Sequence, residues 1–162
     1  MSRTLGYVTP VRAFIGDGEI YMQSASGRVA EALAQHYEKV CVCARVVRRA
    51  PPAPFDGPLN AANLELIEQP YWSSTAGSLF HFFGIARAYL RTCRQADAIF
   101  VRGMCPYIAV LYFFAAIFRK PICHWIVGDP VALLRTNARK KRARRSFGMN
   151  LHAIVTLRIN YV

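Results

Sequence analysis

The sequence has few acidic residues and no long apolar run. It holds 9 Asp and Glu against 21 Lys and Arg, which gives a formal net charge of +12. An excess of this size predicts an anionic partner, either nucleic acid, anionic lipid or a phosphorylated substrate. No apolar signal segment follows the N-terminal residues 1–4, and the longest apolar run, 107–118, is too short to cross a bilayer. We therefore expect a chain that does not span a membrane but lies against one.

The chain also lacks any C-x-x-C pair, and its cysteine count is odd, which argues against a complete set of disulfides. Cys41 and Cys43 would point to the same face of a strand, an arrangement that suits packing better than metal chelation. We expect reduced, mostly buried thiols, a cytoplasmic location and no metal site. The five cysteines are Cys41, Cys43, Cys93, Cys105 and Cys123.

Short apolar runs alternate with helix-like stretches along the chain. Hydrophobic residues make up 54% of the sequence and charged residues 19%, which excludes a disordered chain. This alternation predicts a doubly wound, Rossmann-like α/β fold, with a parallel sheet covered by helices on both faces and a single domain over 1–162. The expected strands are 5–11, 40–47, 64–67, 97–102, 121–127 and 153–157, and the expected helices are 24–37, 78–93, 106–118 (with Pro106 at N1) and 131–146.

Ligands of an open parallel sheet bind beyond the carboxyl ends of its strands, here the loops 10–23, 69–78, 102–106 and 128–130. The first of these loops contains Gly16, Asp17 and Gly18 before a predicted helix, where backbone amides can meet phosphate or sugar oxygens. The pattern is not G-x-G-x-x-G, because Tyr21 stands at the third glycine position. A plain flexible loop is the alternative interpretation.

Aromatic and basic residues at the same edge are candidates for acceptor binding. Tyr71 and Trp72 are rings that could stack on a sugar, and Arg102 ends a predicted strand nearby. The alternative for the two rings is a loop anchored into the core. Core packing is also the favoured interpretation of His81, which lies among phenylalanines. For His124, which lies within a strand, we favour a satisfied core or edge histidine over a general base.

Several segments together resemble glycosyltransferase family 4, the retaining transferases of the GT-B fold. The similar pieces are the opening strand Gly6-Tyr7-Val8-Thr9 with its glycine-bearing loop, the segment Ala96-Asp97-Ala98-Ile99-Phe100-Val101-Arg102-Gly103, and Lys120-Pro121-Ile122-Cys123-His124-Trp125-Ile126-Val127-Gly128-Asp129-Pro130. The segment His152-Ala153-Ile154-Val155-Thr156-Leu157 resembles the next strand of the same domain. The order and spacing of these pieces cover nearly the whole chain.

This resemblance implies the N-terminal, acceptor-side domain of an enzyme that transfers a sugar from a nucleotide-sugar donor to a glycan or a lipid-linked acceptor, without a metal or other cofactor. The loop Gly16, Asp17 and Gly18 would approach the donor diphosphate, and Asp129 would be the catalytic candidate. Gly128 stands where a histidine is common in the family, and a turn-forming Gly-Asp-Pro is the alternative there. The donor-binding domain, with its Glu-x7-Glu motif, is expected beyond this sequence, so the chain alone should be inactive.

The segment 139–145 is the densest basic stretch, with six cationic residues out of seven. Such a run usually has an anionic partner, and each basic residue near an anionic membrane contributes about 1 kcal/mol. We expect peripheral contact with the inner face of the plasma membrane. Nucleic acid is the less favoured partner, because no aromatic residues are interleaved with the basic ones. A helix face that is simply exposed to solvent is the alternative interpretation. A non-enzymatic membrane or interaction module is the second functional hypothesis. The cationic residues are Arg139, Lys140, Lys141, Arg142, Arg144 and Arg145.

Overall fold

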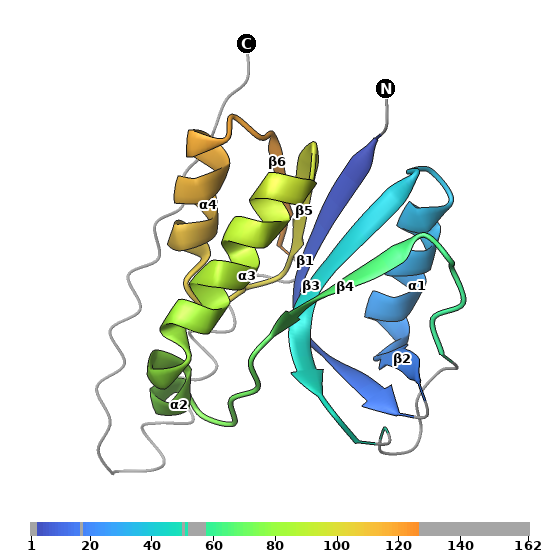
Figure 1. Ribbon diagram of the computed structural model, residues 1–162, viewed down its shortest axis with the longest axis horizontal. Coiled ribbons are helices and arrows are strands. Elements are labelled where there is room, and N and C mark those ends of the chain that lie inside the picture. Colours follow the sequence, from blue (N-terminus) through green and yellow to red (C-terminus); the bar gives the residue numbers. More distant parts are fainter. Residues whose placement is uncertain (1–2, 17, 50, 52–57, 127–162) are drawn as a thin grey trace. The chain divides into compact units, whose positions relative to one another are not determined.

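The computed structural model describes residues 3–16, 18–49, 51 and 58–126, all of which fall within the unit Met1–Val127. Its centre is a six-stranded sheet (Figure 1). Five strands are parallel, in the order β4 (Leu64–Gln69), β3 (Lys39–Val47), β1 (Thr4–Gly16), β5 (Ala98–Arg102) and β6 (Ile122–Trp125). The sixth, β2 (Glu19–Met22), pairs antiparallel with the end of β1.

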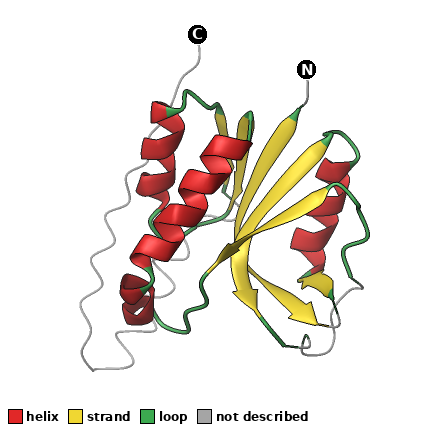
Figure 2. Cartoon of the chain, viewed as in Figure 1, coloured by secondary structure: helices red, strands yellow, loops and turns green. Residues whose placement is uncertain are grey.

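Helices cover both faces of this sheet (Figure 2). Helix α1 (Ser24–Ala34) packs on one face, and α3 (Phe82–Gln95) and α4 (Ile108–Ile117) pack on the other, where the short α2 (Thr75–Phe80) precedes α3. The predicted α/β class, with a mostly parallel sheet between helices, is confirmed. No helix in the described ranges has the length and apolar character needed to cross a bilayer.

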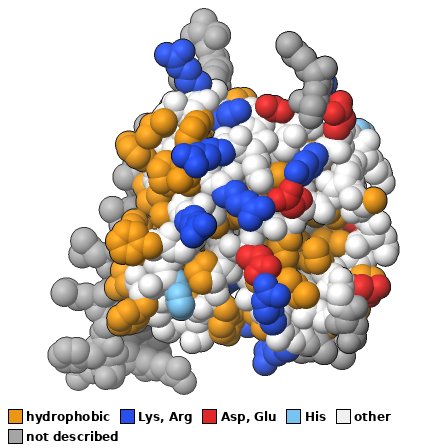
Figure 3. Space-filling model, in the orientation of Figure 1, with side chains coloured by type: hydrophobic (Ala, Val, Ile, Leu, Met, Phe, Trp, Pro, Cys, Tyr) orange, Lys and Arg blue, Asp and Glu red, His pale blue; other side chains and the backbone are white. Residues whose placement is uncertain are grey.

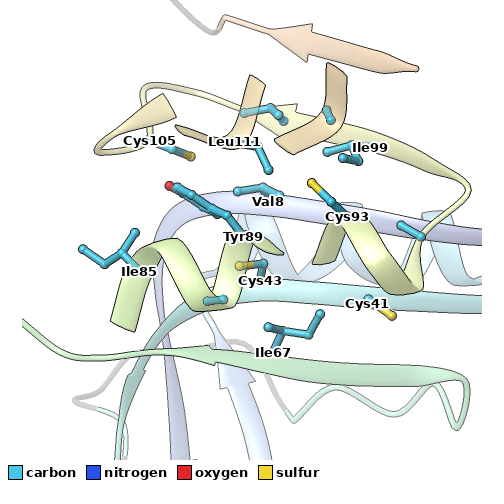
Figure 4. Packing of buried hydrophobic residues seen from close by; sticks show 14 of the residues in the cluster. Val8, Cys41, Cys43, Ile67, Ile85, Tyr89, Cys93, Ile99, Cys105 and Leu111 are labelled. Carbon is cyan, nitrogen blue, oxygen red and sulfur yellow. The ribbon is translucent and has the colours of Figure 1, made fainter. Parts of the chain in front are cut away.

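The alternation of side chains along each strand divides the interior into two cores. On the α1 face, Leu5, Tyr7 and Val42 pack with Ala30. On the other face lies a larger core (Figure 4), which we call the α3–α4 core. Its buried residues include Val8, Cys41, Cys43, Ile67, Ile85, Tyr89, Cys93, Ile99, Val101, Cys105 and Leu111.

Strand β1 is longer than the predicted strand 5–11. It runs through Pro10 and pairs with β5 from Leu5 to Val8. Its pairing with β3 runs from Thr4 to Val8 and, after a register shift between Val8 and Arg12, from Arg12 to Phe14. Proline has no N–H for a ladder and is tolerated at such irregularities. The strand therefore continues into a β1–β2 hairpin that the sequence did not predict.

The predicted helix 78–93 is two helices, separated at His81. The interpretation of His81 as a core residue is wrong, because His81 is exposed, and its neighbours Phe80 and Phe83 are 90% and 83% exposed. Pro106 does not occupy N1 of the next helix either, since Tyr107, with φ of 53°, is its N-cap. Phe83 lies on the side of α3 opposite to its buried residues Ile85, Tyr89 and Thr92, which is why its ring is exposed.

The cysteines are unpaired, and all but Cys123 are buried. Cys41 and Cys43 share the α3–α4 core, as strand alternation predicts. Burial raises the pKa of the Cys43 thiol to about 11 and that of Cys93 to about 12, since a buried thiolate loses its hydration. These buried thiols are therefore packing groups rather than nucleophiles. Cys123 is exposed, so the expectation of a buried thiol is wrong for it.

Candidate functional site at the carboxyl edge of the sheet

The strand order places a topological switch point between β1 and β5. From β1 the chain proceeds to β3 and β4 on one side, then returns to build β5 and β6 on the other. The β1–β5 ladder ends at the pair Val8 and Val101, after which β1 continues beside β3 and pairs with β2. Ligands of doubly wound sheets bind at the carboxyl edge near this point, so the side chains there are the candidates for function.

Gly16 and Gly18 form the turn of the β1–β2 hairpin. Gly16 pairs with Glu19, and Gly18 has φ of 82° with no atom within 4 Å of an added Cβ. Glycine is the residue suited to this backbone conformation. The turn does not lead directly into a helix, because β2 separates it from α1, so a helix N-terminus does not supply its amides. Asp17 lies outside the described residues.

Tyr71 and Trp72 lie together at this edge, and each ring contacts an arginine from a neighbouring strand. The guanidinium carbon of Arg12 lies 5.4 Å from the centre of the Tyr71 ring, and that of Arg45 lies 4.8 Å from the centre of the Trp72 ring. We call these four residues the arginine–aromatic cluster. Trp72 is 8% exposed and belongs to the α3–α4 core, so the core-anchored interpretation is correct for it, whereas Tyr71 is 41% exposed.

The cluster carries positive charge that no described carboxylate neutralises. Neither Arg12 nor Arg45 forms an ion pair within the described part of the chain. Nη2 of Arg45 donates to the carbonyl oxygen of Pro10 at 2.6 Å, and its buried Nε has no hydrogen-bond partner there. Burial, and then the neighbouring charge of Arg12, lower the pKa of Arg45 from its ordinary value. The cluster is thus an electropositive site with free donor capacity.

Arg102 does not join Tyr71 and Trp72, although the sequence grouped the three residues. Its neighbour Val101 points into the α3–α4 core, so strand alternation sends Arg102 to the α1 face. There its Nη1 donates to Oγ of Ser26 at 3.0 Å, and its guanidinium carbon lies 5.6 Å from the centre of the Trp125 ring. The carboxyl edge therefore has two separate arginine sites, one on each face of the sheet.

His124 is a satisfied histidine, as the sequence favoured. Its Nδ1 lies 2.5 Å from the hydroxyl of Tyr112, and its Nε2 lies 2.9 Å from the carbonyl oxygen of Gly103. With both ring nitrogens engaged, it is not poised as a general base. Among the residues that the structure describes, no three His, Cys, Asp or Glu side chains form a metal-binding group.

Two sets of predicted site residues, the catalytic candidate Asp129 and the basic run Arg139, Lys140, Lys141, Arg142, Arg144 and Arg145, lie outside the described residues. Conversely, sequence reasoning missed Arg12 and Arg45. Strand alternation was the available signal, because Arg45 follows Cys41 and Cys43 at intervals of two and must share their face.

The topology and the position of the site define a Rossmann-like α/β domain with an electropositive carboxyl edge. Comparisons with protein-family models, curated proteins and solved structures found no match.

Proposed function

We propose that this chain is the acceptor-binding half of a glycosyltransferase that transfers a sugar from a nucleotide-sugar donor to a glycan or lipid-linked acceptor. The observation that carries the proposal is the arginine–aromatic cluster at the carboxyl edge of a Rossmann-like sheet. The exposed ring of Tyr71 offers an apolar face to a sugar, and the adjacent guanidiniums offer donors to its oxygens. The resemblance to the GT-B transferases of family 4 supports the same assignment.

Under this proposal the acceptor lies on the chain described here, and a second Rossmann-like domain holds the donor. The Gly16–Gly18 turn at the carboxyl edge is the part that would face the donor diphosphate. The described residues then account for acceptor binding and not for the donor site. Binding, rather than turnover, is therefore the property to measure.

We expect that Tyr71→Ala weakens the binding of an acceptor oligosaccharide about fivefold, because a ring contact contributes about 1 kcal/mol. Saturation-transfer NMR with a panel of neutral and lipid-derived oligosaccharides measures this on the full chain. Phe113→Ala is the matched control, since it removes another exposed ring (62% exposed) from α4. Absence of oligosaccharide binding, or equal binding by both variants, would contradict the proposal.

A second candidate, a peripheral module on anionic membranes, is favoured by an apolar patch at the junction of α2 and α3. Leu79, Phe80 and Phe83 are 66%, 90% and 83% exposed. Hydrophobic side chains gather on the side of α2 and α4, beside a band of Lys and Arg over α3 (Figure 3). Exposed apolar groups next to cationic ones match the layering of an anionic lipid surface.

For this candidate we expect that the double change Phe80→Ala and Phe83→Ala lowers partitioning onto anionic vesicles at least tenfold, since each phenyl ring contributes about 1.5–3 kcal/mol when fully buried. Co-sedimentation with vesicles with and without phosphatidylserine gives the partition coefficients. Trp125→Ala, which removes an exposed ring (49% exposed) from β6, is the control. Equal binding to neutral and anionic vesicles, or an unchanged double variant, would exclude this role.

A further inference from the structure

Three polar side chains form a row across neighbouring strands at the carboxyl edge. Arg12 of β1 pairs in register with Arg45 of β3, which pairs in register with Gln69 of β4. Residues in register on parallel strands point to the same face, here the face of the α3–α4 core. The Gln69 side chain is already engaged, since its Nε2 donates to Sγ of Cys43 at 3.1 Å. The two arginines are thus side by side at the end of the row.

This placement of like charges is unfavourable for the chain by itself. Like charges directly opposite each other on neighbouring strands destabilise a sheet, and no carboxylate in the described ranges offsets them. Arg45 is half-buried between Trp72 and the carbonyl oxygen of Pro10, and its Nε is left without a partner among the described groups. An anion beside the two guanidiniums would offset this repulsion and accept hydrogen bonds from their Nη groups.

We propose that Arg12 and Arg45 bind a phosphoryl group. A phosphate monoester carries about −1.5 to −2 charge at pH 7 and three acceptor oxygens, which suits two guanidiniums better than a carboxylate with a single charge. The inference rests on the proposed function in one respect, that the ligand is the acceptor. The acceptor class is then a sugar carried on a phosphate or diphosphate, with the sugar ring beside Tyr71.

The test uses the full chain with inorganic phosphate as the first probe, at constant ionic strength set with chloride. We expect phosphate to raise the melting temperature of the wild-type chain, and isothermal titration to show about tenfold to hundredfold weaker phosphate binding by Arg12→Gln. Without phosphate, Arg12→Gln should melt at the same temperature as the wild type or higher, because it relieves a like-charge contact. A purely structural arginine would instead lower the melting temperature. Arg45→Lys keeps the charge but removes the planar fork, and it should also weaken phosphate binding.

Arg3→Gln is the control, since it removes the same charge from an exposed position before β1. Equal loss of phosphate affinity in Arg3→Gln and Arg12→Gln would overturn the proposal, because the effect would then be one of net charge. Unchanged affinity in Arg12→Gln would overturn it as well.

A second set of titrations separates this inference from the proposed function. Hexose 1-phosphate and a detergent-solubilised lipid-linked sugar diphosphate are compared with free hexose and with phosphate. If either phosphorylated sugar binds more tightly than phosphate, and Arg12→Gln removes this difference, both proposals are supported. Which of the two sugars binds more tightly then identifies the source of the ligand as soluble or lipid-linked. If phosphate binding depends on Arg12 but the sugar adds no affinity, the phosphoryl site stands and the acceptor assignment is rejected. If neutral sugars bind in a manner that depends on Tyr71, and a phosphate group does not change their affinity, the proposed function stands and the phosphoryl site is rejected.

Discussion

Replacing Tyr89 with alanine is expected to lower the free energy of unfolding by about 3–5 kcal/mol, the range typical of large aromatic side chains in a core. Tyr89 is fully buried in the α3–α4 core, where it lies among Val8, Cys43 and Cys105 (Figure 4). Burial raises the pKa of its hydroxyl strongly, so it stays protonated and donates. That hydroxyl donates to the carbonyl oxygen of Pro106 at 2.7 Å.

The alanine variant therefore loses packing and a hydrogen bond together, and Tyr89→Phe separates the two. We expect Tyr89→Phe to cost about 1–2 kcal/mol, because it removes only the donor and leaves the Pro106 carbonyl unpaired. Urea denaturation followed by circular dichroism measures both changes. Leu90→Ala, at a half-buried position next to Tyr89, is the control and should cost less than Tyr89→Ala. A loss below about 1 kcal/mol for Tyr89→Ala would contradict the packing of this core.

The hydrogen bond from the Tyr89 hydroxyl also connects the α3–α4 core with the candidate site. Pro106 follows Cys105, which is buried in the same core as Trp72 of the arginine–aromatic cluster. Tyr89 thus holds the segment that follows β5 at the core that Trp72 also joins. Destabilising variants of the core should be compared with site variants only after their folded fractions are known.

The class of fold could be predicted because its signals are local. The apolar run 98–101 indicates a parallel strand covered on both faces, and the structure confirms it. Ile99 and Val101 pack in the α3–α4 core, and Ala98 and Phe100 pack against the core on the α1 face. Each residue of the run is explained by a core on its own side, so composition and periodicity were sufficient.

The β1–β2 hairpin could not be predicted, because Pro10 is a local stop signal that a tertiary contact overrides. The strand continues past the proline because it keeps its pairing with β3 after the register shift, whereas its pairing with β5 ends at Val8. The patch at the α2–α3 junction was missed because the aromatic run 80–83 suggested core packing. Phe83 lies on the side of α3 opposite to its buried residues, and Phe80 precedes the break at His81.

The candidate site was predicted in part. The position of Tyr71 and Trp72 at the carboxyl edge follows from the end of β4 and needs no tertiary information. The two arginines beside these rings could not be predicted in this way. Arg12 and Arg45 become neighbours only through the register that β1 and β3 adopt after the irregularity in β1. Sequence periodicity gives the face of a residue but not its partner across the sheet.

Replacing Gly6 with alanine is the second change with a large expected effect, a loss of about 2–3 kcal/mol of unfolding free energy. A Cβ at Gly6 would lie 2.7 Å from Cγ2 of Thr92 and 3.1 Å from Cβ of Ala96. Thr92 of α3 and Ala96, the C-cap of that helix, are both fully buried, so neither can move into solvent. Overpacking of this kind typically costs about 1–3 kcal/mol, and the shorter contact points to the upper part of that range. Glycine at this position thus permits α3 to approach β1 closely.

The contact with Thr92 makes the prediction testable by a double-mutant cycle. The Thr92 hydroxyl donates to the carbonyl oxygen of Ala88 at 2.9 Å, which fixes the methyl group toward Gly6. Thr92→Ser removes that methyl group and keeps the hydroxyl, so Gly6→Ala should cost at least about 1 kcal/mol less in the Thr92→Ser background than alone. Urea denaturation of the four chains gives the coupling energy. An uncoupled pair would mean that the alanine is accommodated by a shift of the whole helix, in which case the closeness of α3 to β1 would not be set by Gly6.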